Sequence, residues 1–217
     1  MALNAERILK LAALSLTASS IILTSCSPAS PNTTPTPSAM LTVNTDTRDD
    51  FHITPPDGWT EFSGTYGESG YYYIASANGD TGYSSTAMRV RRESLYILKF
   101  IFKKNPEDPQ FVIDMNEYRD RSIRMSKTTK EVSEVIPLPD RTVGGERAVG
   151  YSDIYTKNGI PQKYETWMVG RHDGIWTLSI NSAPGETVIP PEASAALDTV
   201  YWTPPETPAP SPSPTES

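Results

Sequence analysis

The chain has few of the residues on which stapled domains and many enzymes depend. Its 217 residues include one cysteine and two histidines. One cysteine cannot form an intrachain disulfide, so a disulfide-stapled mini-domain is excluded. Basic residues are outnumbered, 19 against 26 acidic ones, and the formal net charge is −7. An acidic chain repels phosphate, which argues against broad nucleic-acid binding.

Long hydrophobic runs are also missing. The one extended apolar and uncharged run, residues 11–23, has the sequence LAALSLTASSIIL. It is too short for a membrane-spanning helix, which needs about 20 residues. It follows Arg7 and Lys10, and a short basic segment before such a run is typical of a signal peptide.

The four residues after this run, Leu23-Thr24-Ser25-Cys26, resemble the bacterial lipobox. The resemblance implies cleavage between Ser25 and Cys26 and a diacylglyceryl and palmitoyl anchor on the Cys26 thiol. Two acyl chains give stable membrane retention, so we expect a lipoprotein at the extracytoplasmic face of the cell membrane. The alternative is a plain secretory signal peptide in which the cysteine occurs by chance.

Proline-rich stretches mark the limits of the folded part. They read SPASPNTTPTPS over 27–38 and TPPETPAPSPSPTES over 203–217, and such sequences form extended or disordered chain. We therefore predict four segments. They are a signal peptide over 1–25, the lipidated cysteine with a tether over 26–41, a folded domain over 42–203, and a disordered tail over 204–217.

Alternating and continuous apolar patterns predict a sheet of strands within this domain. Asn-Gly and Asp-Gly pairs at 78–79, 158–159 and 173–174 favour tight hairpin turns. The predicted strands cover 51–54, 71–77, 86–92, 95–103, 131–138, 147–156, 162–169 and 175–181.

Two segments have helical signals. Asp114 and Glu117 form a capping box, and Met115, Tyr118, Ser122 and Met125 then recur on one helical face, which predicts a helix over 115–128. A second, short helix is expected over 192–200. Strands, helix, strands and helix in this order predict an α+β fold, an antiparallel sheet flanked by helices in an αβα sandwich.

Several short motifs resemble the PsbP-like superfamily, in particular small actinobacterial lipoproteins of the LpqN type. They are the entry FHITPPDGW over 51–59, the Gly144-Gly145 turn before an aromatic hairpin, and the closing Trp202. The resemblance spans most of 45–203. It implies an αβα sandwich that serves mostly as a non-enzymatic binding or assembly module.

Signals for catalysis, metals or cofactors are weak, and we expect no cofactor. His52 follows several acidic residues, which is conceivable for a metal, but solvated acids are favoured. His172 falls in a predicted turn. Asp80-Thr81-Gly82 matches the aspartic-protease triplet but has no second copy, which that chemistry needs. A hydrolase acting on envelope lipids or polymers without a recognisable motif stays an alternative.

Charge and aromatic residues point instead to contact surfaces. The window 89–130 holds 11 of the 17 basic residues that follow residue 25. Such asymmetry can orient an anchored domain toward an anionic envelope polymer, and an envelope protein is the other expected partner. The alternative, which is favoured, is that strand and helix place these charges on separate solvated faces. Exposed tyrosines favour interfaces. The candidate contact residues are Arg89, Arg91, Arg92, Tyr71, Tyr72 and Tyr73. We therefore expect a lipid-anchored, non-enzymatic binding or assembly module of the envelope.

Overall fold

The computed structural model describes residues 48–66, 70–94, 103, 105, 108 and 113–204. The predicted signal peptide, Cys26 and the tether lie outside these residues, as does the tail beyond Pro204. No helix in the described ranges is long and apolar enough to cross a membrane.

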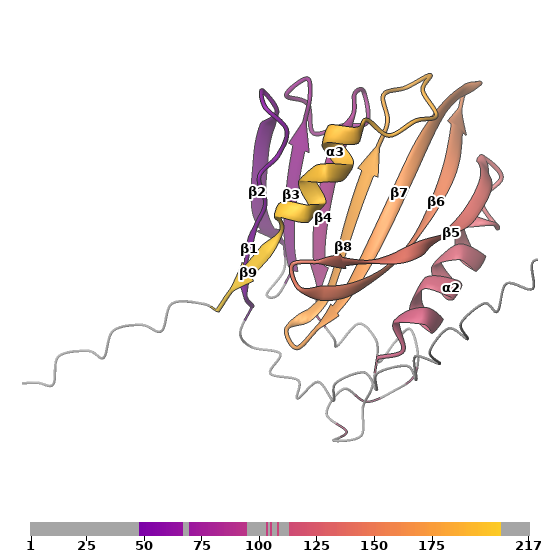
Figure 1. Cartoon of the computed structure of the whole chain (residues 1–217). Coiled ribbons are helices and arrows are strands. Elements are labelled where there is room, and N and C mark those ends of the chain that lie inside the picture. Colours follow the sequence, from indigo (N-terminus) through magenta and orange to yellow (C-terminus); the bar gives the residue numbers. More distant parts are fainter. Residues whose placement is uncertain are drawn as a thin grey trace, which may run out of the picture. The chain divides into compact units, whose positions relative to one another are not determined.

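Seven strands form one antiparallel sheet (Figure 1), in the order β2-β3-β4-β8-β7-β6-β5. Two meanders therefore meet where β4 pairs with β8. The seven strands are β2 (Thr60–Tyr66), β3 (Gly70–Ser76), β4 (Ala87–Glu93), β5 (Val132–Val143), β6 (Glu146–Lys157), β7 (Ile160–Arg171) and β8 (Gly174–Asn181).

The remaining elements are short. They are β1 (Asp50–His52), which pairs with β9 (Tyr201–Thr203), the helices α2 (Met115–Ser126) and α3 (Pro191–Ala196), and a 3-10 turn over Leu197–Thr199. The predicted strands and helices are thus confirmed within the described residues. The strand expected over 95–103 lies outside them, except for Lys103, which is not in a strand.

Turn chemistry explains the hairpins. Asn158 and Gly159 both have positive φ, 53° and 80°, as the two-residue turn between β6 and β7 requires. Gly144 and Gly145 do the same between β5 and β6. The Asn78-Gly79 pair opens a longer loop that joins β3 to β4.

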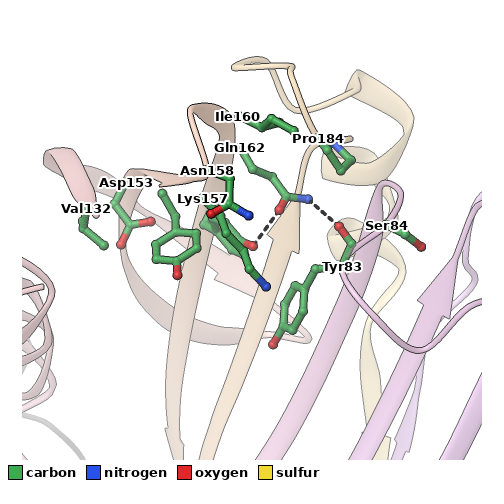
Figure 2. Close-up of a pocket in the computed structure, with 11 residues that line it drawn as sticks. Tyr83, Ser84, Val132, Asp153, Lys157, Asn158, Ile160, Gln162 and Pro184 are labelled. Atoms are coloured by element: carbon green, nitrogen blue, oxygen red, sulfur yellow. Dashed lines mark hydrogen bonds between the residues drawn. The ribbon is translucent and has the colours of Figure 1, made fainter. Parts of the chain in front are cut away.

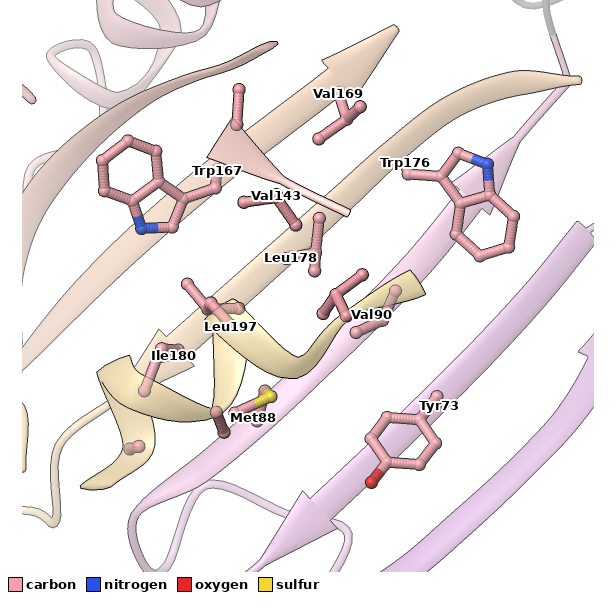
Figure 3. Packing of buried hydrophobic residues seen from close by; sticks show 14 of the residues in the cluster. Tyr73, Met88, Val90, Val143, Trp167, Val169, Trp176, Leu178, Ile180 and Leu197 are labelled. Atoms are coloured by element: carbon pink, nitrogen blue, oxygen red, sulfur yellow. The ribbon is translucent and has the colours of Figure 1, made fainter. Parts of the chain in front are cut away.

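The core lies on one face of the sheet. Trp176, Leu178 and Ile180 alternate along β8 and are fully buried there. Ala193 and Leu197, from α3 and the turn after it, belong to the same cluster. Figure 3 shows Leu197 facing the side chains that β4 and β8 contribute to this core.

The helix α2 lies on the opposite face. Met168 and Gly170 point away from the core, since Trp167 and Val169 between them belong to it. The Ser122 hydroxyl lies 3.8 Å from the Met168 sulfur. A Cβ at Gly170 would come within 2.8 Å of the Met115 sulfur, so the glycine permits this close approach.

The predicted αβα sandwich is wrong. Most of the described secondary structure is sheet, with only two short helices of 12 and 6 residues. The apolar spacing in α2 predicted a helix correctly, but none of its residues is fully buried and Met125 at the end of the stripe is 60% exposed. The strands β5 to β8 are long enough to dominate the fold.

Candidate ligand-binding groove

Strand alternation divides the six predicted contact residues between the two faces of the sheet. Tyr72 pairs with Arg91, and Arg89 pairs with Ile74, so these side chains lie on the face that also carries α2. Tyr71, Tyr73 and Arg92 lie on the core face.

The core-face residues have structural partners. Arg92 is 1% exposed, and its Nε donates to the Asp173 carbonyl at 2.8 Å. The Tyr73 hydroxyl donates to Glu61 at 2.9 Å. Tyr71 is partly buried beside Trp176. Arg92 and Tyr73 are therefore buried in the fold, and we leave them out of the candidate contact surface.

Two adjoining cavities on the opposite face form one groove. The larger, of about 750 Å³, lies among the loop before β4 and the ends of β6 and β7. The smaller, of about 350 Å³, lies over β3, β4 and β8. Tyr83 and Tyr164 line both. We call the two together the tyrosine groove.

Three of the tyrosines that line the groove contact one another. The ring centroids of Tyr83 and Tyr164 are 6.2 Å apart, and those of Tyr155 and Tyr164 are 6.5 Å apart with the planes at 86°. Tilted and edge-to-face contacts of this kind stabilise a fixed arrangement of rings. Tyr83 is 57% exposed, so its ring is available to a ligand.

Gln162 fixes this arrangement from β7. Its amide donates to the Ser182 carbonyl at 2.6 Å and to the Tyr83 carbonyl at 3.3 Å, and its oxygen accepts from the Tyr164 hydroxyl at 2.8 Å. Figure 2 shows Gln162 between the Asp153 end of the groove and Tyr83. Burial raises the pKa of Tyr164 to about 12, so its phenol stays protonated at neutral pH.

The loop before β4 carries Tyr83 and is ordered by its own polar side chains. Asp80 accepts from the Gly82 amide at 3.0 Å and from the Ser84 hydroxyl at 2.6 Å. Both hydrogen bonds lower the pKa of Asp80, and the bond from Ser84 has the larger effect. The Asp80-Thr81-Gly82 triplet is thus part of an exposed turn and not a catalytic carboxylate pair.

Arg89 closes the groove at the sheet. Its guanidinium lies 4.0 Å from the centroid of the Tyr83 ring. It donates to the Asn181 side-chain oxygen, the Gly82 carbonyl and, at 3.4 Å, the Thr81 carbonyl. Its side chain is partly buried, and desolvation lowers the pKa of Arg89. Every acceptor is neutral, so Arg89 has no ion-pair partner within the described ranges.

Asp153 lies at the other end of the groove. It is 9% exposed, and burial raises the pKa of this carboxyl, opposed by a hydrogen bond from Ser126. The charged form is therefore disfavoured in the folded chain.

This perturbation predicts a pH dependence of stability. Because the pKa of Asp153 is raised above its ordinary value of 3.8, the folded chain binds the proton more tightly than the unfolded chain. The stability contributed by that proton is therefore lost as the pH rises from 3.8 through the raised pKa of Asp153 in the folded chain. We expect D153N to be more stable than the wild type at pH 7 and equal to it below about pH 4. Urea unfolding across pH measures this, with D57N, an exposed site, as control. Equal curves for D153N and wild type would refute the assignment.

The histidines have structural surroundings. His52 stacks on Tyr201, with centroids 4.5 Å apart, and contacts the Thr203 hydroxyl. His172 Nε2 is 3.4 Å from Asp49. The part of the chain that the structure describes contains no group of three or more histidine, cysteine or acidic side chains placed to hold a metal ion.

Sequence reasoning missed most of the groove. Tyr155 and Tyr164 lie in hairpin strands where they read as ordinary strand residues, and Gln162 carries no motif. Tyr83 lies in a loop whose sequence has no periodic signal. The pairing of β6, β7 and β8 brings these residues to one place.

Comparisons with known proteins found no matching family model and no matching curated protein. Solved structures do show similarity. A Bacteroides thetaiotaomicron protein is 15% identical with a TM-score of 0.37 over 70% of this chain. The alignment covers 45% of that protein, so this chain spans less than half its length.

Two further structures are similar at the same level. LpqN, involved in cell envelope biogenesis of Mycobacterium tuberculosis, is 14% identical with a TM-score of 0.39, over 73% of this chain and 86% of LpqN. A Pseudomonas aeruginosa protein of unknown function is 11% identical with a TM-score of 0.33, over 63% and 83%. All three TM-scores are below 0.5, so we argue function from the tyrosine groove alone.

Proposed function

We propose that the chain is a non-enzymatic binding module of the cell envelope, which holds a ligand in the tyrosine groove. The observation that carries the proposal is the groove itself. The Tyr164 hydroxyl donates to Gln162, whose amide donates in turn to the backbone carbonyls of Tyr83 and Ser182. Each of the two cavities has the size of a small-ligand site. Cys26, as the predicted lipid attachment site, would hold the module at the extracytoplasmic face.

Binding is favoured over hydrolysis because of what lines the groove. Asp153, with its raised pKa, is the feature that a hydrolase would use. Glycoside hydrolysis needs two carboxyl groups, and among the described residues lining the larger cavity Asp153 is the one carboxylate. Ser84 lines the same cavity but donates its hydroxyl to Asp80, with no histidine in the lining to activate it.

The test is binding to envelope material. We expect the chain from residue 26, made as C26S so that it stays in solution, to co-sediment with peptidoglycan sacculi that carry their attached glycopolymers. Y83A removes an exposed ring from the groove and is expected to weaken binding about tenfold, which corresponds to about 1.4 kcal/mol.

The matched control is Y201A. Tyr201 is 53% exposed, similar to Tyr83, but lies on β9 away from the groove. It should bind like the parent chain. Equal binding by Y83A and the parent, or no binding of the parent to the sacculi, would overturn the proposal.

A further inference from the structure

We propose that the tyrosine groove takes an acidic sugar, with its oxyanion against Arg89 and Arg91 and its ring against Tyr83 and Tyr164. The proposal rests on the function proposed above and names the chemical class of the ligand. The shared chemistry is a phosphate or carboxylate joined to a hydroxyl-bearing ring. It could come from a free sugar, a wall polymer or a lipid headgroup.

Two arginines lie beside two hydroxyl side chains in the smaller cavity. Arg89 and Arg91 are two residues apart on β4, so they lie on the same face. On the neighbouring strand, Ser179 is opposite Arg89 and Thr177 is opposite Arg91. All four line the smaller cavity. Guanidinium groups and hydroxyls are the donors that bind oxyanions through charge-assisted hydrogen bonds.

Arg89 is a partly buried cation whose hydrogen bonds all go to neutral oxygens. Asp80 acts on it only through space, since that carboxylate is bonded to Gly82 and Ser84. A partly buried cation without an ion pair is unfavourable. An oxyanion in the smaller cavity would give Arg89 a charged acceptor.

Local charge favours the same ligand. Among the charged residues that line the groove, Arg89, Arg91 and Lys157 outnumber the one acidic residue, Asp153. Arg91 has an ion pair with Glu93 at 2.8 Å, but its side chain stays 58% exposed. The chain as a whole carries −7. A basic groove on an acidic protein selects anions locally and repels them elsewhere.

Tyrosine rings lie where the body of such a ligand would extend. Tyr83 and Tyr164 line both cavities, so a molecule whose anion lies over β4 extends its remainder across these rings. A tyrosine offers an apolar ring and a polar hydroxyl, which match the apolar face and polar rim of a sugar. Lys157, Asn158 and Asp153 line the far end and can bond to sugar hydroxyls.

Calorimetric titration of the C26S chain tests this directly. The probes are glucose 1-phosphate and glucuronate, with glucose and inorganic phosphate as the neutral and ring-free controls. We expect each acidic sugar to bind at least tenfold more tightly than either control. Raising the salt from about 0.05 M to about 0.5 M should weaken the binding, because salt screens the attraction between the arginines and the anion.

Variants locate the anion. R91Q removes an exposed cation and is expected to weaken glucose 1-phosphate binding about tenfold. R89Q is expected to abolish it, but Arg89 also holds the loop, so R91Q is the deciding variant. The matched control is R48Q. Arg48 lies over the Tyr71 ring at 4.6 Å, on the other face of the sheet, and its loss should leave binding unchanged.

Each outcome is decisive. Glucose binding as tightly as glucose 1-phosphate, with loss in Y83A, would overturn the acidic-sugar proposal and leave the binding function intact. Phosphate binding as tightly as the sugar phosphate would refute the role of the rings. Binding to phosphatidylinositol vesicles but not to phosphatidylglycerol vesicles would support the same chemistry in a lipid headgroup. No binding of any probe would overturn the proposal.

Discussion

Replacing Arg171 with methionine is expected to lower the free energy of unfolding by about 3–5 kcal/mol, the largest stability effect that we anticipate. The Arg171 side chain is 9% exposed. Its guanidinium bonds to Asp49 at 2.7 Å and to Glu146 at 3.0 Å, and lies 3.5 Å from Asp173. Removing it leaves two carboxylates, those of Asp49 and Asp173, buried without this cation.

The position of this cluster in the fold increases the effect. Asp49 immediately precedes β1, Arg171 is the last residue of β7, and Asp173 lies in the turn between β7 and β8. The guanidinium also lies 4.3 Å from the Trp202 ring on β9. The cluster therefore joins the β1–β9 pair to the main sheet, and its loss should expose the side of the core that this pair covers.

The matched control is R147M. Arg147 also has two side-chain partners, Asp140 at 2.6 Å and Asn116 at 2.7 Å, but it is half exposed. Exposed ion pairs contribute about 0–1 kcal/mol, so R147M should change little. Urea unfolding followed by tryptophan fluorescence and circular dichroism measures both. Similar losses in the two variants would contradict the role given to the buried cluster.

Replacing Cys26 with alanine is expected to abolish the incorporation of palmitate, because its thiol is the predicted attachment site of the acyl chains. Two acyl chains bury many methylene groups at about 0.8 kcal/mol each, which is enough for stable retention in the membrane. When the full chain is expressed in a bacterium that processes lipoproteins, it should partition into detergent and incorporate labelled palmitate. C26A should incorporate no label.

The neighbouring serine supplies the control for this variant. S27A leaves the thiol in place and should behave as the wild type, both in detergent partition and in label. Wild-type chain without label, or C26A with as much label as the wild type, would show that the lipobox resemblance is accidental.

Much of the strand arrangement could be predicted because it depends on local signals. Asn158-Gly159 and the Gly144-Gly145 pair demand positive φ, and the strands on either side alternate in polarity. Asp114 caps α2 as expected, accepting from the amides of Asn116 and Glu117. Helix packing was harder, because spacing shows which residues share a face and not how much of a sheet that face covers.

The groove could not be predicted because it depends on contacts distant in the sequence. Arg89 and Asn181 are 92 positions apart and meet only because β4 pairs with β8. Side chains alternate between the two faces along a strand, so Tyr72 lies on the other face from Tyr71 and Tyr73. The sequence implies this separation but does not show which face of the sheet carries a groove. Composition pointed to arginines and tyrosines as contact residues, while strand pairing decides which of them face the groove.

The measurement that tests the central claim most directly is an NMR titration of the C26S chain with labelled tyrosines, using soluble wall fragments released from sacculi by lysozyme. If the groove is the binding site, the resonances of Tyr83, Tyr155 and Tyr164 shift, while those of Tyr71 and Tyr201, which line neither cavity, stay in place. Shifts confined to Tyr71 and Tyr201, or no shifts at saturating fragment, would contradict the assignment of the ligand site to the tyrosine groove.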